Sequence, residues 1–323
     1  MRSESCMIPC NMAKRICILA SGGDAPGMNA CFEAIYHRAS EFGLEVFAAM
    51  HGFDGLIDDD IVRVTRENGT GISGVSGCVF KCARSPRFKT RDGFASAIAT
   101  IKKHQFDALI ALGGDGSFIG LGRLKNAGVP LVGIPATIDN DVPFTKESLG
   151  FSSACENAVE LIDMLKVTME TNGRDHVVQI MGRHCNDLAQ TIGEATFADI
   201  IDMEGHRHTP KMVADIFAQK RRQGKTSCFM IMLERKNTDV VQEAIANANY
   251  LQELTQVSGN SSIRMNTLGH LQRGARPSCH DRFLAVTYGR AALDCVMRKK
   301  FGVSVAMING QIKLVNIDLT PIP

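Results

Sequence analysis

Short runs of apolar residues alternate along this chain with longer segments in which apolar residues recur every three or four positions. The short runs have the length of buried β-strands, and the longer segments have the period of amphipathic α-helices. Strands are predicted at residues 15–20, 45–50, 107–112, 129–134, 175–181, 227–233 and 303–308. Helices are predicted at residues 28–41, 94–104, 117–126, 154–168, 209–222, 239–254 and 281–299.

A regular alternation of strands and helices is typical of βαβ units, which place parallel strands in a sheet with helices on its faces. The chain has 323 residues, more than a single hydrophobic core usually holds. We therefore predict an α/β protein of two Rossmann-like lobes with mainly parallel sheets, and a crossing between the lobes near Gly150. Ligands of such sheets bind beyond the carboxyl ends of the strands.

Clusters rich in glycine and aspartate follow three of the predicted strands. They are Ser21-Gly22-Gly23-Asp24, Gly113-Gly114-Asp115-Gly116-Ser117 and Thr137-Ile138-Asp139-Asn140-Asp141. Glycine after a strand lets backbone N–H groups approach a bound phosphate closely. Carboxylates repel a bare phosphate, so Asp115, Asp139 and Asp141 need other roles, as a Mg²⁺ ligand or as a base for an attacking hydroxyl. The clusters therefore predict a phosphoryl-transfer enzyme.

Positively charged residues occur in several of the other predicted loops. Arg84 precedes a predicted helix, Arg183 follows a predicted strand, and Arg264 begins a further β-like run. His270 and Arg273 belong to one glycine-flanked turn. Each of these arginines alone would be an ordinary surface residue, and the histidine alone a structural imidazole. Together they supply the charge that a reaction between two phosphorylated substrates requires.

Charge and cysteine content narrow the functional classes. Lysine and arginine number 36 against 34 acidic residues, and a net charge of +2 argues against a general binder of nucleic acid or membrane surfaces. No apolar stretch has the length of a membrane span, and residues 1–13 lack the apolar core of a signal peptide and are expected to form a loose tail. The 11 cysteines include no C-x-x-C pair; Cys6/Cys10 and Cys78/Cys82 are spaced i,i+4 without matching histidines. Reduced thiols in a cytoplasmic protein are expected.

With these motifs in this order, the chain resembles the bacterial-type ATP-dependent 6-phosphofructokinases from about Lys14 to about Asp318. The resemblance implies an ATP-binding lobe of residues 14–150, to which residues 272–323 return, and a fructose 6-phosphate-binding lobe of residues 151–271. It implies transfer of the γ-phosphoryl group of ATP to O1 of fructose 6-phosphate, the committed step of glycolysis, with Mg²⁺ as cofactor. It also implies a homotetramer with shared active sites.

The resemblance further implies a role for each matching residue. The ATP-binding residues would be Gly23, Arg84, Ser85, Gly113, Gly114, Asp115, Gly116 and Ser117, with Asp115 also holding Mg²⁺. Those of catalysis would be Asp139 as proton acceptor, with Arg84, Thr137 and Arg183. The sugar contacts would be Thr137, Asp139, Asp141, Met181, Gly182, Arg183 and Glu234. The 6-phosphate contacts would be Arg174, Arg264, His270 and Arg273, the first two reaching in from a neighbouring subunit.

Two positions bear on the phosphoryl donor, and several bear on regulation. Relatives that use pyrophosphate resemble this chain but carry Asp in place of Gly116 and Lys in place of Ala136, so ATP is the expected donor. Phe197 stands where the family's effector site has glycine, although Arg66 and Lys225 of that site remain. Arginine or lysine is replaced there at four positions, which are Glu33, His37, Gln223 and Thr226. We therefore predict a weak or absent response to ADP and phosphoenolpyruvate.

Two other functions stay open at this point. A non-catalytic regulatory subunit of the same fold would suit the altered effector site, but it has no chemical need for Asp115, Asp139 or Arg84. A kinase for another acceptor, such as a different sugar phosphate or NAD, would share the Gly-Gly-Asp-Gly cluster. The set of four residues matched to the 6-phosphate suits a phosphorylated sugar better than NAD.

Overall fold

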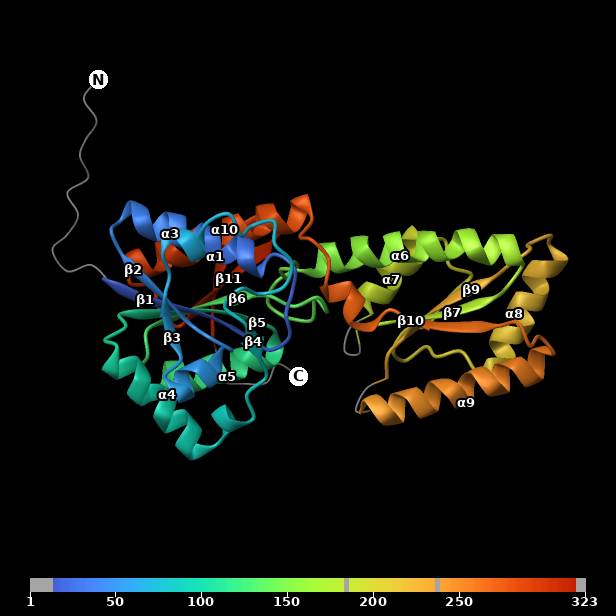
Figure 1. The fold of residues 1–323 in the computed structure, drawn as a ribbon, viewed down its shortest axis with the longest axis horizontal. Helices are drawn as coiled ribbons and strands as arrows, with labels where there is room; N and C mark the ends of the chain where they lie inside the picture. The colour runs from blue at the N-terminus through green and yellow to red at the C-terminus, as the bar shows by residue number, and fades with distance from the viewer. Residues whose placement is uncertain (1–13, 183–185, 236–238, 318–323) are drawn as a thin grey trace, which may run out of the picture.

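The computed structural model describes residues 14–182, 186–235 and 239–317, which form two lobes joined end to end (Figure 1). The large lobe contains a sheet of eight strands among these residues. Its strands are β1 (Arg15–Ser21), β2 (Glu45–Ala49), β3 (Ile61–Arg63), β4 (Cys82–Ala83), β5 (Ala108–Gly113), β6 (Leu131–Pro135), β11 (Val303–Ile308) and β12 (Gln311–Asn316). The order across the sheet is β12-β11-β6-β5-β1-β2-β3, and β4 also pairs with β1.

The central strands of the large sheet are parallel, and their carboxyl ends are in register. Ser21 pairs with Gly113 of β5 and with Ala83 of β4, and Gly113 pairs in turn with Pro135 of β6. Only the outer pairings β2–β3 and β11–β12 of the described sheet are antiparallel. The chain therefore leaves four neighbouring strands at one edge of the sheet, where ligands of parallel sheets bind.

Helices cover both faces of the large sheet (Figure 1). The elements of one face are α1 (Met28–Glu41), α3 (Arg66–Gly69) and α10 (Cys279–Met297), and those of the other are α2 (Phe53–Asp58), η1 (Arg87–Lys89), α4 (Arg91–Lys103) and α5 (Asp115–Asn126). Side chains of β1 alternate between the two cores: Ile16 and Ile18 pack with α1 and α10, and Cys17 and Leu19 with α2, α4 and α5. Because β1 is buried on both faces, its residues form a continuous apolar run in the sequence.

The small lobe repeats this arrangement around four parallel strands in the order β10-β7-β9-β8. The strands are β7 (His176–Ile180), β8 (Ile200–Ile201), β9 (Phe229–Leu233) and β10 (Arg264–Thr267). The helices are α6 (Phe151–Asn172) and α7 (Asp187–Ala195) on one face, and α8 (Pro210–Arg222) and α9 (Val240–Ser258) on the other. The short helix η2 (Gly269–Arg273) then leads the chain back to the large lobe.

Helix α6 leaves the large lobe at a tightly packed junction. A Cβ atom at Gly150, where φ is 106°, would lie 2.7 Å from the Cβ of Ala25, so this close approach requires glycine. The buried carboxylate of Asp281, on α10, accepts hydrogen bonds from the backbone N–H groups of Gly150 at 2.9 Å and Ser153 at 2.8 Å. Burial raises the pKa of Asp281, and these hydrogen bonds oppose that rise. The junction thus ties the start of α6 to α10.

The predicted α/β fold class is confirmed, and each predicted strand and helix corresponds to an observed one. Helix α1 and strand β11 have the predicted bounds, whereas α6 extends at both ends beyond the predicted residues 154–168. The short elements α2, α3, α7, β3, β4 and β8 were not predicted, and neither was β12. Residues 1–13, expected to be a loose tail, lie outside the described residues.

Candidate functional site

The loops that follow the central strands of the large sheet are hydrogen-bonded to one another. The Gly22 N–H donates to the carbonyl oxygen of Ala83 at 3.0 Å, which links the loop after β1 to the end of β4. The Ser117 hydroxyl, in the first turn of α5, donates to the carbonyl oxygen of Ser21 at 3.1 Å. The segments that follow β1, β4 and β5 are separated in the sequence, but these hydrogen bonds join them along one edge of the large sheet.

The glycines before and within α5 differ in the space around them. A Cβ atom at Gly113 would lie 2.5 Å from the Cβ of Ser117, and one at Gly114 would lie 3.2 Å from the Cβ of Thr137. A Cβ atom at Gly116 would have no described atom within 4 Å. The first two glycines therefore permit close backbone packing, while Gly116 and the exposed Asp115 border open space.

The loop after β6 presents two carboxylates beside this helix start. Thr137 is buried, and its hydroxyl oxygen accepts a hydrogen bond from the Asp139 N–H at 3.2 Å. Asp139 and Asp141 are both half-buried. Because the close contact of Gly114 with Thr137 joins this loop to α5, Asp139 and Asp115 belong to neighbouring loops of the same edge.

Asn140 fixes the shape of that loop and links it to the small lobe. Its φ of 54° is left-handed, a conformation that asparagine tolerates better than most residues. Its side-chain oxygen accepts from the Ser148 N–H at 2.8 Å, and its amide donates to the Lys146 carbonyl oxygen at 3.2 Å. The same amide donates to the carboxylate of Asp187, at the start of α7, at 3.2 Å. The loop after β6 therefore contacts both lobes.

Helix η2 brings a buried arginine against the loop after β1. Arg273 is 8% exposed, and its guanidinium donates to the carbonyl oxygen of Asp24 at 2.7 Å. A Cβ atom at Gly23 would lie 2.9 Å from the same guanidinium nitrogen, so a larger residue there would displace the guanidinium. His270, on the same short helix, is exposed, as is Arg84, which directly follows β4. Gly23 and Arg273, assigned by resemblance to different phosphates, are therefore in contact.

The carboxyl end of the small sheet faces the same junction between the lobes. Met181 directly follows β7, and its N–H donates to the side-chain oxygen of the fully buried Gln272 at 2.8 Å. Glu234 directly follows β9, and its N–H donates to the carbonyl oxygen of Ile180, at the end of β7, at 3.0 Å. Arg207 donates to the carbonyl oxygen of Glu234 at 3.0 Å. No pattern in the sequence marks Gln272 or Arg207 as a support of these loops.

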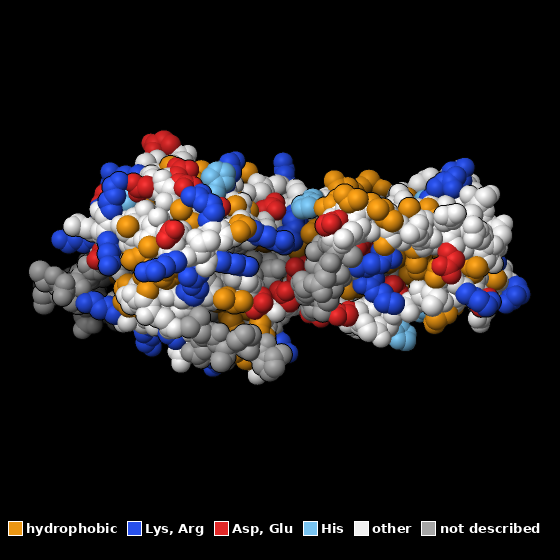
Figure 2. Space-filling view, turned by 90° about the horizontal axis from the view of Figure 1, so that it is seen from below, with side chains coloured by type: hydrophobic (Ala, Val, Ile, Leu, Met, Phe, Trp, Pro, Cys, Tyr) orange, Lys and Arg blue, Asp and Glu red, His pale blue; other side chains and the backbone are white. Residues whose placement is uncertain are grey.

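Of the remaining sugar-loop residues, Gly182 is buried with a φ of 109°, and Arg183 lies outside the described residues. Ser85, which follows Arg84, is held by its hydroxyl, which donates to the Asp54 carboxylate of α2 at 2.6 Å. Figure 2 shows acidic side chains gathered where the two lobes meet. This agrees with the carboxylates that the loops after β5 and β6 carry.

Arg174 and Arg264 lie at the opposite edge of the small sheet. The Arg264 N–H donates to the carbonyl oxygen of Asp175 at 3.0 Å, so the two arginines occupy adjacent chain segments at the amino ends of β10 and β7. Both side chains are exposed. With a rise of about 3.3 Å per residue, the strand places them roughly 20 Å from Met181. Within one chain, therefore, the structure does not bring them to the other candidate residues.

The residues matched to the effector site have two distinct surroundings. The carboxylate of Glu33 accepts hydrogen bonds from the backbone N–H groups of Gly71, Ile72 and Ser73 at 2.7, 3.0 and 2.7 Å. Burial tends to raise the pKa of Glu33, but the hydrogen bonds from Gly71 and Ser73 outweigh it and lower the pKa. His37 lies 3.5 Å from the same carboxylate.

The second group lies on the small lobe. Phe197 is 82% exposed, and its φ of 56° is left-handed. It borders a hollow that Thr226 and Lys225 also line. The Lys225 ammonium forms an ion pair with the Asp199 carboxylate at 2.6 Å. A carboxylate in this chain therefore already neutralises one of the two retained basic residues.

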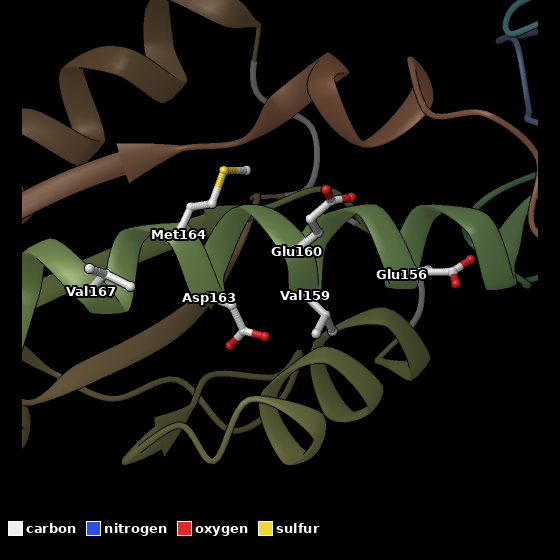
Figure 3. A pocket seen from close by; sticks show the side chains of 6 residues that line it. All are labelled: Glu156, Val159, Glu160, Asp163, Met164 and Val167. Atoms are coloured by element: carbon white, nitrogen blue, oxygen red, sulfur yellow. The ribbon is translucent and has the colours of Figure 1, made fainter.

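A shallow hollow runs along the outer face of α6, away from the loops at the carboxyl ends of the two sheets (Figure 3). Its lining residues are Glu156, Val159, Glu160, Asp163, Met164 and Val167. Met164 is 57% exposed and Val167 is 69% exposed. Among the described residues, no helix has both the length and the apolar character that crossing a membrane requires.

Comparison with known proteins matches the chain to one family along nearly its whole length. Residues 15–296 match the phosphofructokinase family. The chain is 36% identical to an ATP-dependent 6-phosphofructokinase of Lactobacillus delbrueckii subsp. bulgaricus over 299 residues, which cover 93% of this chain and 91% of that protein. It is also 36% identical to the ATP-dependent 6-phosphofructokinase of Streptococcus uberis over 300 residues, covering 93% and 87% of the two chains.

Solved structures show the same fold. The phosphofructokinase of Saccharomyces cerevisiae superposes with a TM-score of 0.82 at 28% identity, covering 94% of this chain and 45% of the yeast chain, so the present chain spans less than half of that protein. A pyrophosphate-dependent phosphofructokinase of Marinobacter aquaeolei superposes with a TM-score of 0.81 at 20% identity, covering 96% and 86%. From the family match and the identity to the bacterial enzymes, we conclude that this chain belongs to the phosphofructokinase family.

Proposed function

We propose that this protein transfers the γ-phosphoryl group of ATP to O1 of fructose 6-phosphate, giving fructose 1,6-bisphosphate and ADP in the cytoplasm. The observation that carries the proposal is that the glycine- and aspartate-rich loops after β1, β5 and β6 meet at one edge of the large sheet. Hydrogen bonds and close contacts of Gly22, Ser117 and Thr137 hold these loops together. The resemblance of the chain to ATP-dependent relatives supports the choice of substrates.

The ATP phosphates are assigned to the loops after β1 and β5. The residues from Gly113 to Ser117 would offer backbone N–H groups at the start of α5, where the helix dipole favours an anion, and Gly23 would add its own from the loop after β1. Ser85 would lie beside the nucleotide. Arg84 is exposed at the end of β4 and would neutralise charge on the transferring phosphoryl group.

The donor set fits a magnesium ion shared with the nucleotide. The described residues contain no group of three or more His, Cys, Asp or Glu side chains that would hold a metal by themselves. Mg²⁺ usually takes one or two protein carboxylates and completes its shell with substrate phosphates and water. The exposed carboxylate of Asp115 at the start of α5 suits that role. When bound, the ion would neutralise charge on the phosphate oxygens.

The sugar is assigned to the loops after β6, β7 and β9. Asp139 would accept the proton of the 1-hydroxyl as O1 attacks the γ-phosphorus, with Thr137 holding the loop. Asp141 lies beside them in the same loop. From the small lobe, the loops after β7 and β9 would contact the sugar through Met181, Gly182, Arg183 and Glu234. Gln272 and Arg207 support these loops from behind.

The 6-phosphate would be bound by residues of two subunits. His270 and Arg273 lie on η2 beside the site, whereas Arg174 and Arg264 lie at the far edge of the small sheet. Exposed arginines there would enter the site of another copy in a homotetramer. The exposed apolar side chains Met164 and Val167 of α6 suit burial between copies.

The lobes are then divided by ligand. We assign residues 14–150 and 272–323 to the ATP-binding lobe, since β11, β12 and α10 belong to the large sheet and its covering helices. Residues 151–271 would form the fructose 6-phosphate-binding lobe. With this division, the reacting groups would meet at the junction where Asn140 of one lobe contacts Asp187 of the other.

A coupled assay for fructose 1,6-bisphosphate tests the proposal directly. With Mg²⁺ and fructose 6-phosphate, ATP should give a kcat/KM at least roughly tenfold above that with pyrophosphate, or about 1.4 kcal/mol of barrier. Equal or faster reaction with pyrophosphate overturns the donor assignment. Absence of turnover with either donor would favour a non-catalytic subunit, and turnover with another sugar phosphate alone would change the acceptor.

The shared site has its own test, which uses one variant that should bind fructose 6-phosphate weakly and one that should have a low kcat. An Arg174→Ala chain keeps Asp139, and an Asp139→Ala chain keeps Arg174. Hybrid oligomers of the two should recover activity, because some sites then combine both intact residues. Hybrids that form, as shown by native mass spectrometry, yet recover nothing would refute the assignment of Arg174 to a neighbouring site.

A further inference from the structure

Two cysteines beside the candidate site take no part in the proposed reaction. Cys78 and Cys82 lie close enough that each thiol shifts the pKa of the other, and both are free thiols of intermediate exposure. Five of the other described cysteines are buried. A small solute can therefore reach the pair more readily than it can reach those buried thiols.

A tight turn brings the two cysteines together. The Lys81 N–H donates to the carbonyl oxygen of Cys78 at 3.0 Å, and Lys81 has a left-handed φ of 59°. The chain then enters β4, where Cys82 pairs with Ala20 of β1. The contact between the thiols is thus fixed by backbone structure on both sides.

The surroundings give the two sulfurs different chemical character. The hydrogen bond from Cys78 lowers the pKa of Cys82; burial and the charge of Asp24 oppose this shift, and the charge of Arg273 assists it. The same contact, together with burial, raises the pKa of Cys78. Because the thiolate is the nucleophile in thiol chemistry, Cys82 is the attacking sulfur and Cys78 the resolving one.

We propose that Cys78 and Cys82 form a reversible disulfide that slows phosphoryl transfer when the protein meets hydrogen peroxide. The Cys82 thiolate attacks one peroxide oxygen, and the O–O bond breaks to leave a sulfenic acid and hydroxide, which takes up a proton to become water. The Cys78 thiol then loses its proton, attacks the Cys82 sulfur and expels the oxygen as a second water. Two thiols are oxidised and one peroxide is reduced.

The disulfide acts on the site through β4. An S–S bond of about 2.05 Å is much shorter than any non-bonded contact of two sulfurs, so oxidation must draw Cys82 and the turn before it toward each other. The Ala83 carbonyl oxygen accepts the Gly22 N–H at 3.0 Å, and Arg84 follows directly, so both move with β4. Misplacing a positioning group by about 1 Å lowers rates by up to ~10²-fold. We expect kcat to fall by about 10- to 100-fold on oxidation.

Trypsin offers a direct readout, because Lys81 lies between the two cysteines. Cleavage after Arg66, Lys81 and Arg84 releases residues 67–81 and 82–84 as separate peptides, which the disulfide holds together. Protein treated with hydrogen peroxide, alkylated and digested without reductant should give this linked species in mass spectrometry. Dithiothreitol should remove it.

Serine variants test whether the disulfide changes the phosphotransferase activity, and the exposed Cys279 provides the control position. Wild type and Cys279→Ser should lose activity with peroxide and regain it with dithiothreitol. Cys82→Ser should be insensitive, and Cys78→Ser should accumulate a Cys82 sulfenic acid that dimedone traps. The inference is overturned if no linked peptide forms at peroxide concentrations that oxidise Cys279, or if the peptide forms and activity is unchanged.

The measurement of activity rests on the proposed function, but the detection of the linked peptide by mass spectrometry does not. If the reduced protein has no phosphotransferase activity, the proposed function fails, while the linked peptide still shows or refutes the disulfide. If a serine variant does not fold, the wild-type peptide and its reversal decide between the two outcomes.

Discussion

Two glycines at the start of α5 offer a sharp test of where the nucleotide binds, because a side chain at Gly113 would clash with its neighbours whereas a side chain at Gly116 would not. A Cβ atom at Gly113 would lie 2.5 Å from the Cβ of Ser117 and 2.9 Å from the carbonyl oxygen of Ser21. A Cβ atom at Gly116 would have no described atom within 4 Å. Alanine at Gly113 must push α5 away from β1, whereas alanine at Gly116 fits in place.

The cost at Gly113 follows from these distances. Ordinary contacts of a Cβ atom begin at 3.4 Å, so Ser117 must retreat by about 1 Å (3.4 less 2.5). Such overpacking costs about 1–3 kcal/mol of the free energy of unfolding. A shift of that size in the phosphate loop lowers rates by up to ~10²-fold. We expect Gly113→Ala to lower kcat/KM for ATP by about 10- to 100-fold.

Gly116 separates this steric effect from an electrostatic one. Gly116→Ala should leave the free energy of unfolding unchanged or raise it by up to about 1 kcal/mol, because alanine favours a helix more than glycine does. Gly116→Asp adds a negative charge in the same open space. At a separation of about 6 Å and an effective dielectric constant of ~20, repulsion of one phosphate charge costs roughly 3 kcal/mol, or about 100-fold in ATP affinity.

Steady-state kinetics with each substrate varied in turn, together with urea unfolding, would distinguish these outcomes. Gly116→Asp should fold normally and lose ATP affinity, with little change in KM for fructose 6-phosphate. The reasoning is refuted if Gly113→Ala and Gly116→Asp both use ATP like the wild type. It is also refuted if their losses fall on fructose 6-phosphate instead.

Three further outcomes are expected. Asp139→Asn should lower kcat by about 10²- to 10⁴-fold with both KM values nearly unchanged, as steady-state kinetics of the folded variant would show. Fructose 6-phosphate saturation should be nearly hyperbolic, and a several-fold shift in half-saturation with millimolar phosphoenolpyruvate would contradict this. Glu33→Gln should be less stable than wild type at pH 7 in urea unfolding. Because folding lowers the pKa of Glu33, its contribution is present above the unfolded pKa of about 4.3 and is lost as pH falls through the folded value, so the difference should shrink in acid.

The main elements of the fold were predictable because their signals are local. An apolar strand buried on both faces, or a helix with one apolar face, shows its period within its own residues. Strand β12 was missed because most of its residues are exposed, so it has no apolar run to mark it. Its turn did carry a signal: Asn309 and Gly310, with φ of 52° and 72°, form the Asn-Gly pair typical of β-hairpins.

The candidate site was predictable to the extent that it lies at strand ends. The clusters after β1, β5 and β6 follow apolar runs in the sequence, and the register of the sheet places them side by side. Gln272 and Arg207 support loops that are distant from them in the sequence, so no local pattern marks them. Arg174 and Arg264 were named from the sequence, but only the pairing of β10 with β7 brings them to one edge.

Glu33, which stands where the family's effector site has a basic residue, affects that region through its hydrogen bonds as well as through its charge. From the sequence, a carboxylate in place of a basic residue would simply repel an anionic ligand. In the structure, the same carboxylate accepts the N–H groups of Gly71, Ile72 and Ser73. An incoming anion would have to displace Glu33 and replace three charge-assisted hydrogen bonds, which are worth about 1.5–3 kcal/mol each. In this chain the Glu33 carboxylate already occupies these backbone donors, so we expect a weak effector response from occupancy as well as from repulsion.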